Sequence, residues 1–226
     1  MAVLFLVALS ACHFGPKPHM AEWDGLETGA KRGRIVQDAR NFIYAHDLMV
    51  DGRRFPFDCS GLVGAVLLKN GIDVFGGASE LEIRGNGVRI VREFVGRYGT
   101  LYTMTPPGQG DLIFFSNTYD RDRDGLLNDD LTHIGIVEEV DSDGTVTFIH
   151  NVHHGVGRYV MNLDFPHQHR NAQGKIINSY LRKRRRSDRK NTPYLAGSLF
   201  ENFGTLVREP AVARSASNLD SASRIH

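Results

Sequence analysis

The sequence predicts an α+β fold in which N-terminal helices pack on a central antiparallel β-sheet. Apolar residues at helical spacing over 31–46 and after residue 58, followed downstream by apolar strands with short polar turns, indicate this class. With 41% hydrophobic and 23% charged residues, the chain has a globular composition. A net charge of +1 gives no overall attraction to nucleic acid, so we expect no nucleic-acid partner.

Two helices come first. Residues 31–46, KRGRIVQDARNFIYAH, carry apolar residues at helical spacing: Ile35, Ala39, Phe42 and Ile43. After the polar turn DGRR, Asp58 is a suitable N-cap for the segment SGLVGAVLLK, and Asn70-Gly71 provides a C-terminal stop. Cys59 is therefore expected in the first turn of a buried helix.

A strand and a hairpin follow. Residues 112–115 predict a buried strand, and THIGIVEEV and GTVTFIHNV, separated by DSDG, predict a β-hairpin. If the loop has an even number of residues, Ile136 faces Ile149 and Gly135 faces His150. Gly135 then leaves space beside His150, and His133 lies on the same face. If the loop has an odd number of residues, Asn151 instead of His150 lies on the same face as His133.

The cysteine and the two histidines form a candidate catalytic set. Backbone N–H groups and the helix dipole at a helix N-terminus favour a thiolate, as expected for Cys59. One histidine can act as a general base and a second polar group can orient it. A small buried cysteine and strand histidines without a role are the alternatives.

The motifs FDCSGLV, GDLIFF and THIGIVEEV followed by FIHN resemble the NlpC-type cell-wall cysteine peptidases over residues 31–155. The resemblance implies a papain-like fold, Cys59 as nucleophile, His133 as its base and His150 as the orienting residue, with no cofactor required for catalysis. It also implies hydrolysis of peptide bonds in peptidoglycan stem peptides, commonly between D-glutamyl and diaminopimelyl residues. Two alternatives stay open: an N-acetylmuramoyl-L-alanine-type amidase with the same triad, and a non-catalytic wall-binding lipoprotein.

One segment departs from that family. Its members carry a tyrosine shortly before a Gly-Gly pair upstream of the cysteine, whereas this chain has HDLMVDGRRFPF. Arg53 or Arg54 either binds a stem-peptide carboxylate there or is an exposed turn residue.

The segment DRDRDGLLNDD, residues 120–130, resembles a calcium-binding loop. Four residues occupy positions 1, 3, 5 and 9 of an EF-hand-type loop: Asp120, Asp122, Asp124 and Asn128. Leu131 stands at position 12, where an acid is expected, although Asp129 or Asp130 can substitute in a shorter loop. We expect a structural calcium beside the active site, with a solvated acidic loop as the alternative.

The N-terminus resembles a lipoprotein signal. Residues 1–12, MAVLFLVALSAC, form a short apolar run that ends in a lipobox-like LSAC. Lipidation of Cys12 would anchor the protein to a membrane at the periplasmic face of a bacterial cell envelope. His13 in place of an aspartate favours the outer over the inner membrane. An apolar N-terminus of a cytosolic protein is the alternative.

The remaining segments complete the predicted organisation. Residues 13–30 are expected to form a flexible tether, 31–210 the peptidase domain and 211–226 a disordered tail. Within the domain, the segment with histidines at 153, 154, 167 and 169 predicts a polar loop rather than a zinc site. GKIINSYLR predicts a strand that runs into the basic stretch 182–190, either solvated or in contact with anionic lipid or acidic glycan.

Overall fold

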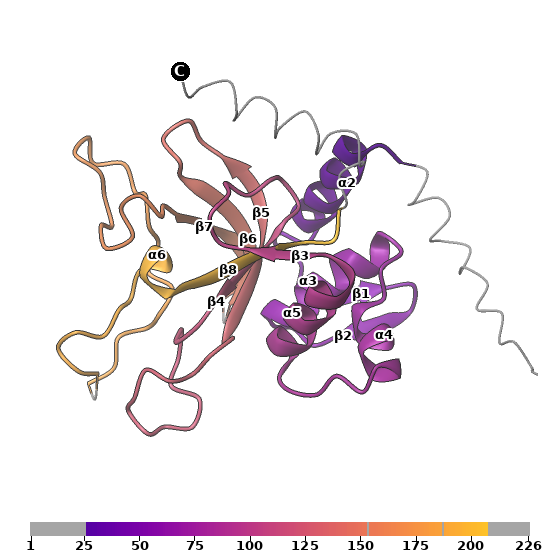
Figure 1. Ribbon diagram of the computed structural model, residues 1–226, viewed down its shortest axis with the longest axis horizontal. Helices are drawn as coiled ribbons and strands as arrows, with labels where there is room; N and C mark the ends of the chain where they lie inside the picture. Colours follow the sequence, from indigo (N-terminus) through magenta and orange to yellow (C-terminus); the bar gives the residue numbers. More distant parts are fainter. Residues whose placement is uncertain (1–25, 153, 187, 208–226) are drawn as a thin grey trace, which may run out of the picture.

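The computed structural model describes residues 26–152, 154–186 and 188–207 (Figure 1). The predicted lipobox with Cys12, most of the tether and the C-terminal tail lie outside the described residues. The helices are α2 (Thr28–Asn41), α3 (Cys59–Lys69), α4 (Val74–Glu80), α5 (Gly87–Tyr98) and α6 (Ala196–Leu199). The strands are β1 (Leu48–Val50), β2 (Arg53–Phe55), β3 (Thr100–Tyr102), β4 (Leu112–Phe115), β5 (His133–Val140), β6 (Val146–Val152), β7 (Gly155–Met161) and β8 (Phe200–Thr205).

A six-stranded antiparallel sheet forms the centre of the molecule, with strand order β3-β8-β4-β5-β6-β7. Helices α2, α3 and α5 lie on one side of it, and α6 with the loops that follow β7 lies on the other (Figure 1). The predicted α+β class, with helices packed on an antiparallel sheet, is confirmed.

Side-chain alternation along the strands divides the core into two clusters. Ile134, Ile136 and Ile149 belong to the cluster shared with α3, where Leu62 and Val66 are buried. The opposite face of the sheet carries a second cluster: Ile113, Phe115, Val137, Phe148 and Phe203. Because neighbouring strand residues point to opposite faces, this arrangement also sends His150 and Asn151 to different sides of the sheet.

Helix α3 begins as predicted. The Asp58 side chain accepts hydrogen bonds from the Gly61 N–H and the Ser60 hydroxyl, each at 2.8 Å. A Cβ on Gly61 would lie 1.9 Å from the Pro56 carbonyl oxygen, so only glycine fits in this turn. The helix ends at Lys69, before the predicted Asn70-Gly71 stop.

The first helix and the turn after it differ from the prediction. Helix α2 runs over Thr28–Asn41 rather than over 31–46, so it begins inside the predicted tether 13–30. Tyr44 adopts the left-handed conformation with φ of 70°. The segment predicted as a polar turn is a hairpin, β1–β2, in which Asp51 and Gly52 have φ values of 49° and 76°. Two positive φ values in a two-residue Asp-Gly loop are typical of a type I′ turn.

The β5–β6 hairpin combines an odd loop with a bulge. Val140 pairs with Val146, which leaves the five residues 141–145 between them. Glu138 has no partner on β6, because Val137 pairs with Phe148 and Glu139 with Thr147. An odd loop alone would turn each β6 residue beyond it to the opposite face of the sheet, and the extra residue Glu138 cancels this change. Ile136 therefore pairs with Ile149 as predicted, and His150 keeps its predicted face.

The segment after β6 corrects two predictions. The expected polar loop contains strand β7, which pairs with β6 from Gly155 to Met161. The expected strand over GKIINSYLR is a loop with isolated β-bridges. The Asn178 side chain forms hydrogen bonds with backbone groups that no strand partner satisfies there. Asn178 accepts from the N–H groups of Asn162 and Gly197 and donates to two carbonyl groups.

Candidate active site

A cavity of about 480 Å³ lies where the N-terminus of α3 meets the start of β5 and the end of β6. Its walls include Cys59, His133 and Asn151, together with Thr118 and Thr132 from the loop before β5. The structure therefore brings the predicted nucleophile and base to one cavity.

Cys59 is the first residue of α3 and is partly exposed. Burial of the sulfur, followed by the negative charge of Asp58, raises the pKa of Cys59 to about 12. The backbone N–H groups of Ile134, Ser60 and Cys59 itself lower the pKa by less than this. The helix N-terminus lowers the pKa of Cys59, as expected, but the increase caused by desolvation is larger. The expected resting thiolate is therefore corrected to a thiol that needs a base.

His133 and His150 are coupled directly. The distance from His133 Nε2 to His150 Nδ1 is 2.8 Å, and the ring planes meet at 90°. This contact engages Nε2 of His133 and leaves Nδ1 as the nitrogen that can receive a proton from the cavity. Burial lowers the pKa of His133 to about 4, so its imidazole is neutral at pH 7 and can serve as a base.

His150 is fully buried behind His133. The rings of Phe148 and Tyr159 lie 5.2 Å and 4.1 Å from its ring centroid, and burial holds its pKa well below the usual value. Within the described residues, its Nε2 has no hydrogen-bond partner. The predicted space beside Gly135 is filled, because a Cβ there would lie 2.7 Å from the Phe148 ring. His150 can orient His133 but does not reach the cavity surface.

The Cys59 thiol and the His133 base line one cavity, and among the described residues no hydrogen bond joins them. Catalytic hydrogen bonds are often long before substrate binds, so the arrangement agrees with a resting nucleophile and base. What the site can do chemically is transfer the thiol proton to an imidazole during attack on a carbonyl group.

Asn151 also lines the cavity, although the sequence predicts it there only if the β5–β6 loop has an odd number of residues. Its side chain is 2% exposed and lines the cavity from the helix-facing side of the sheet. Neither its amide oxygen nor its amide nitrogen has a hydrogen-bond partner among the described residues. A buried amide without partners is costly unless a ligand satisfies it, which points to a role in binding. The signal was present in the sequence as the alternative to His150.

Comparison with protein-family models finds a match to the CHAP domain over residues 50–151. This segment is a CHAP domain. It runs from the last residue of β1 to the penultimate residue of β6 and contains Cys59, His133 and His150. No curated protein and no solved structure matches the chain.

The CHAP domain is a cysteine peptidase or amidase domain of the NlpC and papain-like type. The recognition of that type from FDCSGLV, GDLIFF and THIGIV is confirmed. A CHAP domain implies cell-wall hydrolase activity with peptidoglycan as substrate. Helix α2, strands β7 and β8 and the loops between these two strands lie outside the matched segment.

The two arginines upstream of the CHAP cysteine are paired with acids. Arg53 Nη1 lies 2.9 Å from Asp73 Oδ1, and Arg54 Nη1 lies 3.4 Å from Asp47 Oδ2. Neither arginine is among the residues that line the cavity with Cys59. Their expected contact with a substrate carboxylate is not supported. Arg54 is exposed, as in the alternative, but it lies on strand β2 and not in a turn.

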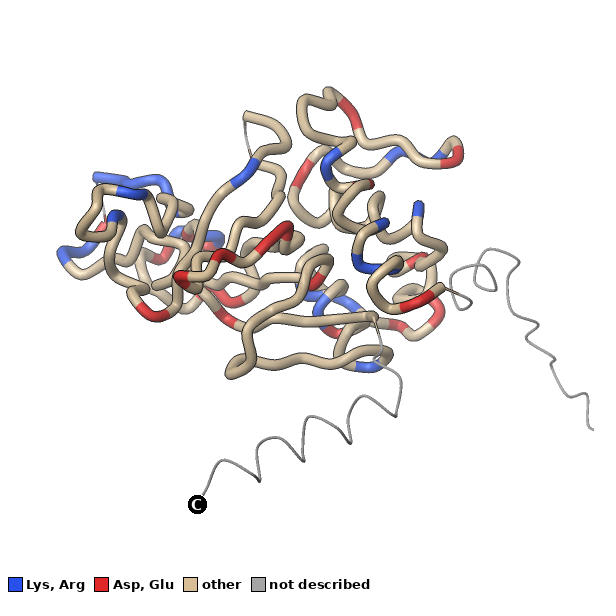
Figure 2. Tube along the Cα trace, turned by 90° about the horizontal axis from the view of Figure 1, so that it is seen from above, with Lys and Arg blue, Asp and Glu red and all other residues tan. Residues whose placement is uncertain are grey.

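A basic segment lies beside the cavity instead. A second cavity shares Thr118 and Tyr119 with the first and is also lined by Arg182, Lys183 and Arg185. Arg182 is buried and donates to the carbonyl oxygen of Asn117, which fixes the start of this segment against the loop before β5. Figure 2 shows Lys and Arg positions gathered at the end of the molecule formed by the loops that follow β7.

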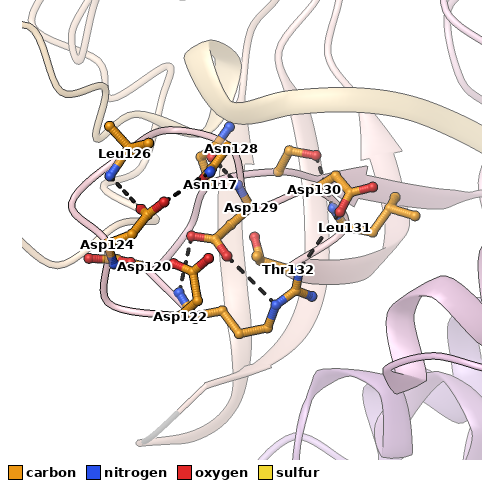
Figure 3. A network of polar contacts seen from close by, with 12 residues as sticks. Asn117, Asp120, Asp122, Asp124, Leu126, Asn128, Asp129, Asp130, Leu131 and Thr132 are labelled. Atoms are coloured by element: carbon orange, nitrogen blue, oxygen red, sulfur yellow. Dashed lines mark hydrogen bonds and ion pairs between the residues drawn. The ribbon is translucent and has the colours of Figure 1, made fainter.

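The predicted calcium-loop residues separate into two groups (Figure 3). Asp120 and Asp122 lie together with Asp129, with one carboxylate oxygen from each within 4.8 Å of the others. Asp124 accepts hydrogen bonds from the Leu126 N–H and the Asn128 side chain, so Asp124 and Asn128 form a separate turn. Asp129 thus stands where Asp124 and Asn128 were expected.

In the described part of the chain, no single helix has both the length and the apolar content needed to cross a membrane. Among the described helices, α3 and α4 taken together reach that length and composition, and they are bent by 97° relative to each other.

Proposed function

We propose that the CHAP domain is a cysteine endopeptidase with a papain-like fold that hydrolyses peptide bonds in peptidoglycan stem peptides. The observation that carries the proposal is the shared cavity of Cys59 and His133, with His150 bonded to the far nitrogen of that base. Attack by Cys59 Sγ on the substrate carbonyl carbon transfers the thiol proton to His133 Nδ1. Collapse of the tetrahedral intermediate breaks the C–N bond, and the same proton leaves with the amine.

A thioester between Cys59 and the acyl part of the substrate remains. Water then attacks the thioester carbon and gives its proton to His133, which returns a proton to the departing sulfur. Acid and free thiol are the products, so no cofactor is required. His150 orients His133 through the ring contact, and Asn151 donates an amide N–H to the bound peptide. The nearby Lys183 and Arg185 suit an acidic peptide, such as one containing the bond between D-glutamyl and diaminopimelyl residues.

We place this activity at the periplasmic face of the bacterial envelope, at the outer membrane rather than the inner, with Cys12 as the lipidated anchor. An anchored enzyme would stay close to a polymer that cannot diffuse. Metabolic labelling with a clickable fatty acid tests this part: the wild type should be labelled and Cys12→Ala should not. Labelling of both would contradict the assignment of Cys12.

Digestion of purified peptidoglycan tests the reaction. The full chain should release peptide fragments cut within the stem, identified by mass spectrometry, and Cys59→Ser should release none while keeping the wild-type circular dichroism spectrum. Free intact stem peptides with peptide-free glycan would instead identify the amidase. Identical product profiles for wild type and Cys59→Ser would favour the non-catalytic wall-binding protein.

A further inference from the structure

Hydrogen bonds join the two ends of the loop between β4 and β5. The Asn117 N–H donates to the Asp129 carbonyl at 2.7 Å, and the Asp129 N–H donates to the Asn117 side chain at 2.9 Å. Thr118 donates to the Thr132 hydroxyl through both its N–H and its own hydroxyl, each at 2.9 Å. The side chains of Asp120, Asp122 and Asp129 lie together in this loop (Figure 3).

Three of these carboxylates form a compact cluster. One oxygen from each of Asp120, Asp122 and Asp129 lies within 4.8 Å of the other two. Asp120 is 9% exposed and Asp129 is 2% exposed, whereas Asp122 is exposed to solvent. Like charges at this distance and burial repel one another strongly unless a cation lies between them.

The cluster is not neutralised by its own contacts. Asp120 Oδ2 accepts the Gly125 N–H at 3.2 Å, but Asp120 Oδ1 is buried and has no hydrogen-bond partner among the described residues. Arg121 Nε approaches Asp129 Oδ1 at 3.6 Å, and its guanidinium also reaches Asp130. A single, partly exposed arginine against three carboxylates leaves an excess of negative charge at a buried oxygen.

We propose that Asp120, Asp122 and Asp129 bind one calcium ion. The donors are all carboxylate oxygens, which suit a hard cation and not zinc, and calcium accepts the flexible, incomplete oxygen shell that a loop and water can complete. Mg²⁺ demands a stricter octahedral arrangement and binds such loops less readily. The ligand set differs from the EF-hand spacing in the sequence, because the chain returns through Asp129 instead of continuing to position 12.

The ion would act on the catalytic cavity through a short connection. Asp129 is four residues before His133, and Thr118 and Thr132, which bond to each other at the loop base, line the cavity with Cys59. Bound calcium would therefore fix one wall of the cavity and the start of β5. It takes no part in the bond-making steps.

Calorimetric titration of the EGTA-treated full chain with CaCl₂ tests the site. One ion should bind per chain, and MgCl₂ should bind more weakly. Asp122→Asn should weaken calcium binding by about tenfold or more. Because Asp122 is exposed, this change removes a ligand charge without disturbing a buried group. Asp129→Asn provides a second, buried ligand variant, whose folding is checked in EGTA by circular dichroism.

Asp124→Asn is the matched control, since it removes the same charge from the same loop but outside the cluster. Its calcium affinity should stay within about twofold of wild type. Failure of the wild type to bind calcium would overturn the proposal, as would equal losses in Asp122→Asn and Asp124→Asn. Either result would leave the peptidase assignment intact, because binding is measured without substrate.

Discussion

His150 accepts or donates a hydrogen bond at the nitrogen of His133 that faces away from the catalytic cavity, at 2.8 Å. Since one hydrogen is shared between the two nitrogens, the protonation of His150 decides whether His133 presents a lone pair or an N–H at Nδ1. The base is competent only when His150 Nδ1 is the acceptor. The buried residue thus controls the chemical state of the one that meets substrate.

The first prediction concerns this coupling. His150→Ala should lower kcat on peptidoglycan peptides by about a hundredfold with little change in KM, because His133 loses its orientation but substrate contacts remain. His150→Asn, which restores an acceptor oxygen, should recover part of the loss. Steady-state kinetics with a defined stem peptide measure both. A loss confined to KM would contradict the orienting role.

The second prediction concerns the resting thiol. With a pKa of about 12, Cys59 should react slowly with iodoacetamide at pH 7, and its rate should still be rising at pH 10. Mass spectrometry of the peptide containing Cys59 follows the modification, and Asp58→Asn should increase the rate by removing a negative charge. A rate that levels off below pH 8 would mean that the thiolate is already present at rest.

The third prediction concerns stability in acid. Burial lowers the pKa of His133 in the folded state to about 4, whereas its value in the unfolded chain is 6.5. Between these pH values the unfolded state binds more protons than the folded state. The contribution of His133 to the free energy of unfolding is therefore fully present above pH 6.5 and decreases as the pH falls. From pH 7 to pH 5 this group alone should reduce the free energy of unfolding by about 2 kcal/mol.

Urea titrations at the two pH values measure this decrease. The variant His133→Gln, which cannot titrate, should show a smaller pH dependence than the wild type. Equal slopes in the two proteins would show that His133 is not buried in its neutral form.

The fourth prediction concerns Asn151. Asn151→Leu removes two unsatisfied buried polar atoms and should raise the free energy of unfolding by about 1 kcal/mol. The same change should lower kcat/KM by about tenfold, because the amide that binds substrate is lost. Denaturant unfolding and kinetics on one preparation test the pair of effects. A variant that loses both stability and activity would indicate a structural role only.

The fifth prediction concerns the basic segment beside the cavity. Lys183→Glu with Arg185→Glu should raise KM for an acidic stem peptide several-fold and leave kcat nearly unchanged, since both residues lie next to the cavity that holds Cys59 and outside it. The difference should shrink in high salt. The matched control is Arg84→Glu with Arg97→Glu, neither of which lines the Cys59 cavity or the second cavity beside it.

Local signals predicted much of the fold. The Asp58 cap, the end of α3, strand β4 and the pairing of Ile136 with Ile149 depend on neighbouring residues, and all four are confirmed. The Asp51-Gly52 hairpin is also predictable from its turn residues, although the prediction for this segment extends only to a polar turn. Strand β7 was missed because its glycines and polar residues are held by pairing with β6, which is a tertiary contact.

The site was only partly predictable for a similar reason. Side-chain parity placed His133 and His150 on one face, but it could not show that burial would raise the pKa of Cys59 or lower that of His133. The grouping of Asp129 with Asp120 depends on the hydrogen bonds to Asn117, which linear spacing does not contain. Desolvation and loop closure are properties of the assembled molecule.

Glu138, the bulge residue of β5 that has no partner on β6, matters for recognising related enzymes. The two histidines are 17 positions apart, yet one of those positions is absorbed by the bulge. A chain that lacked this residue would form a regular ladder and bring the same two rings together at a shorter interval. Searches that require a fixed interval between the two histidines would therefore miss chains with the same active site.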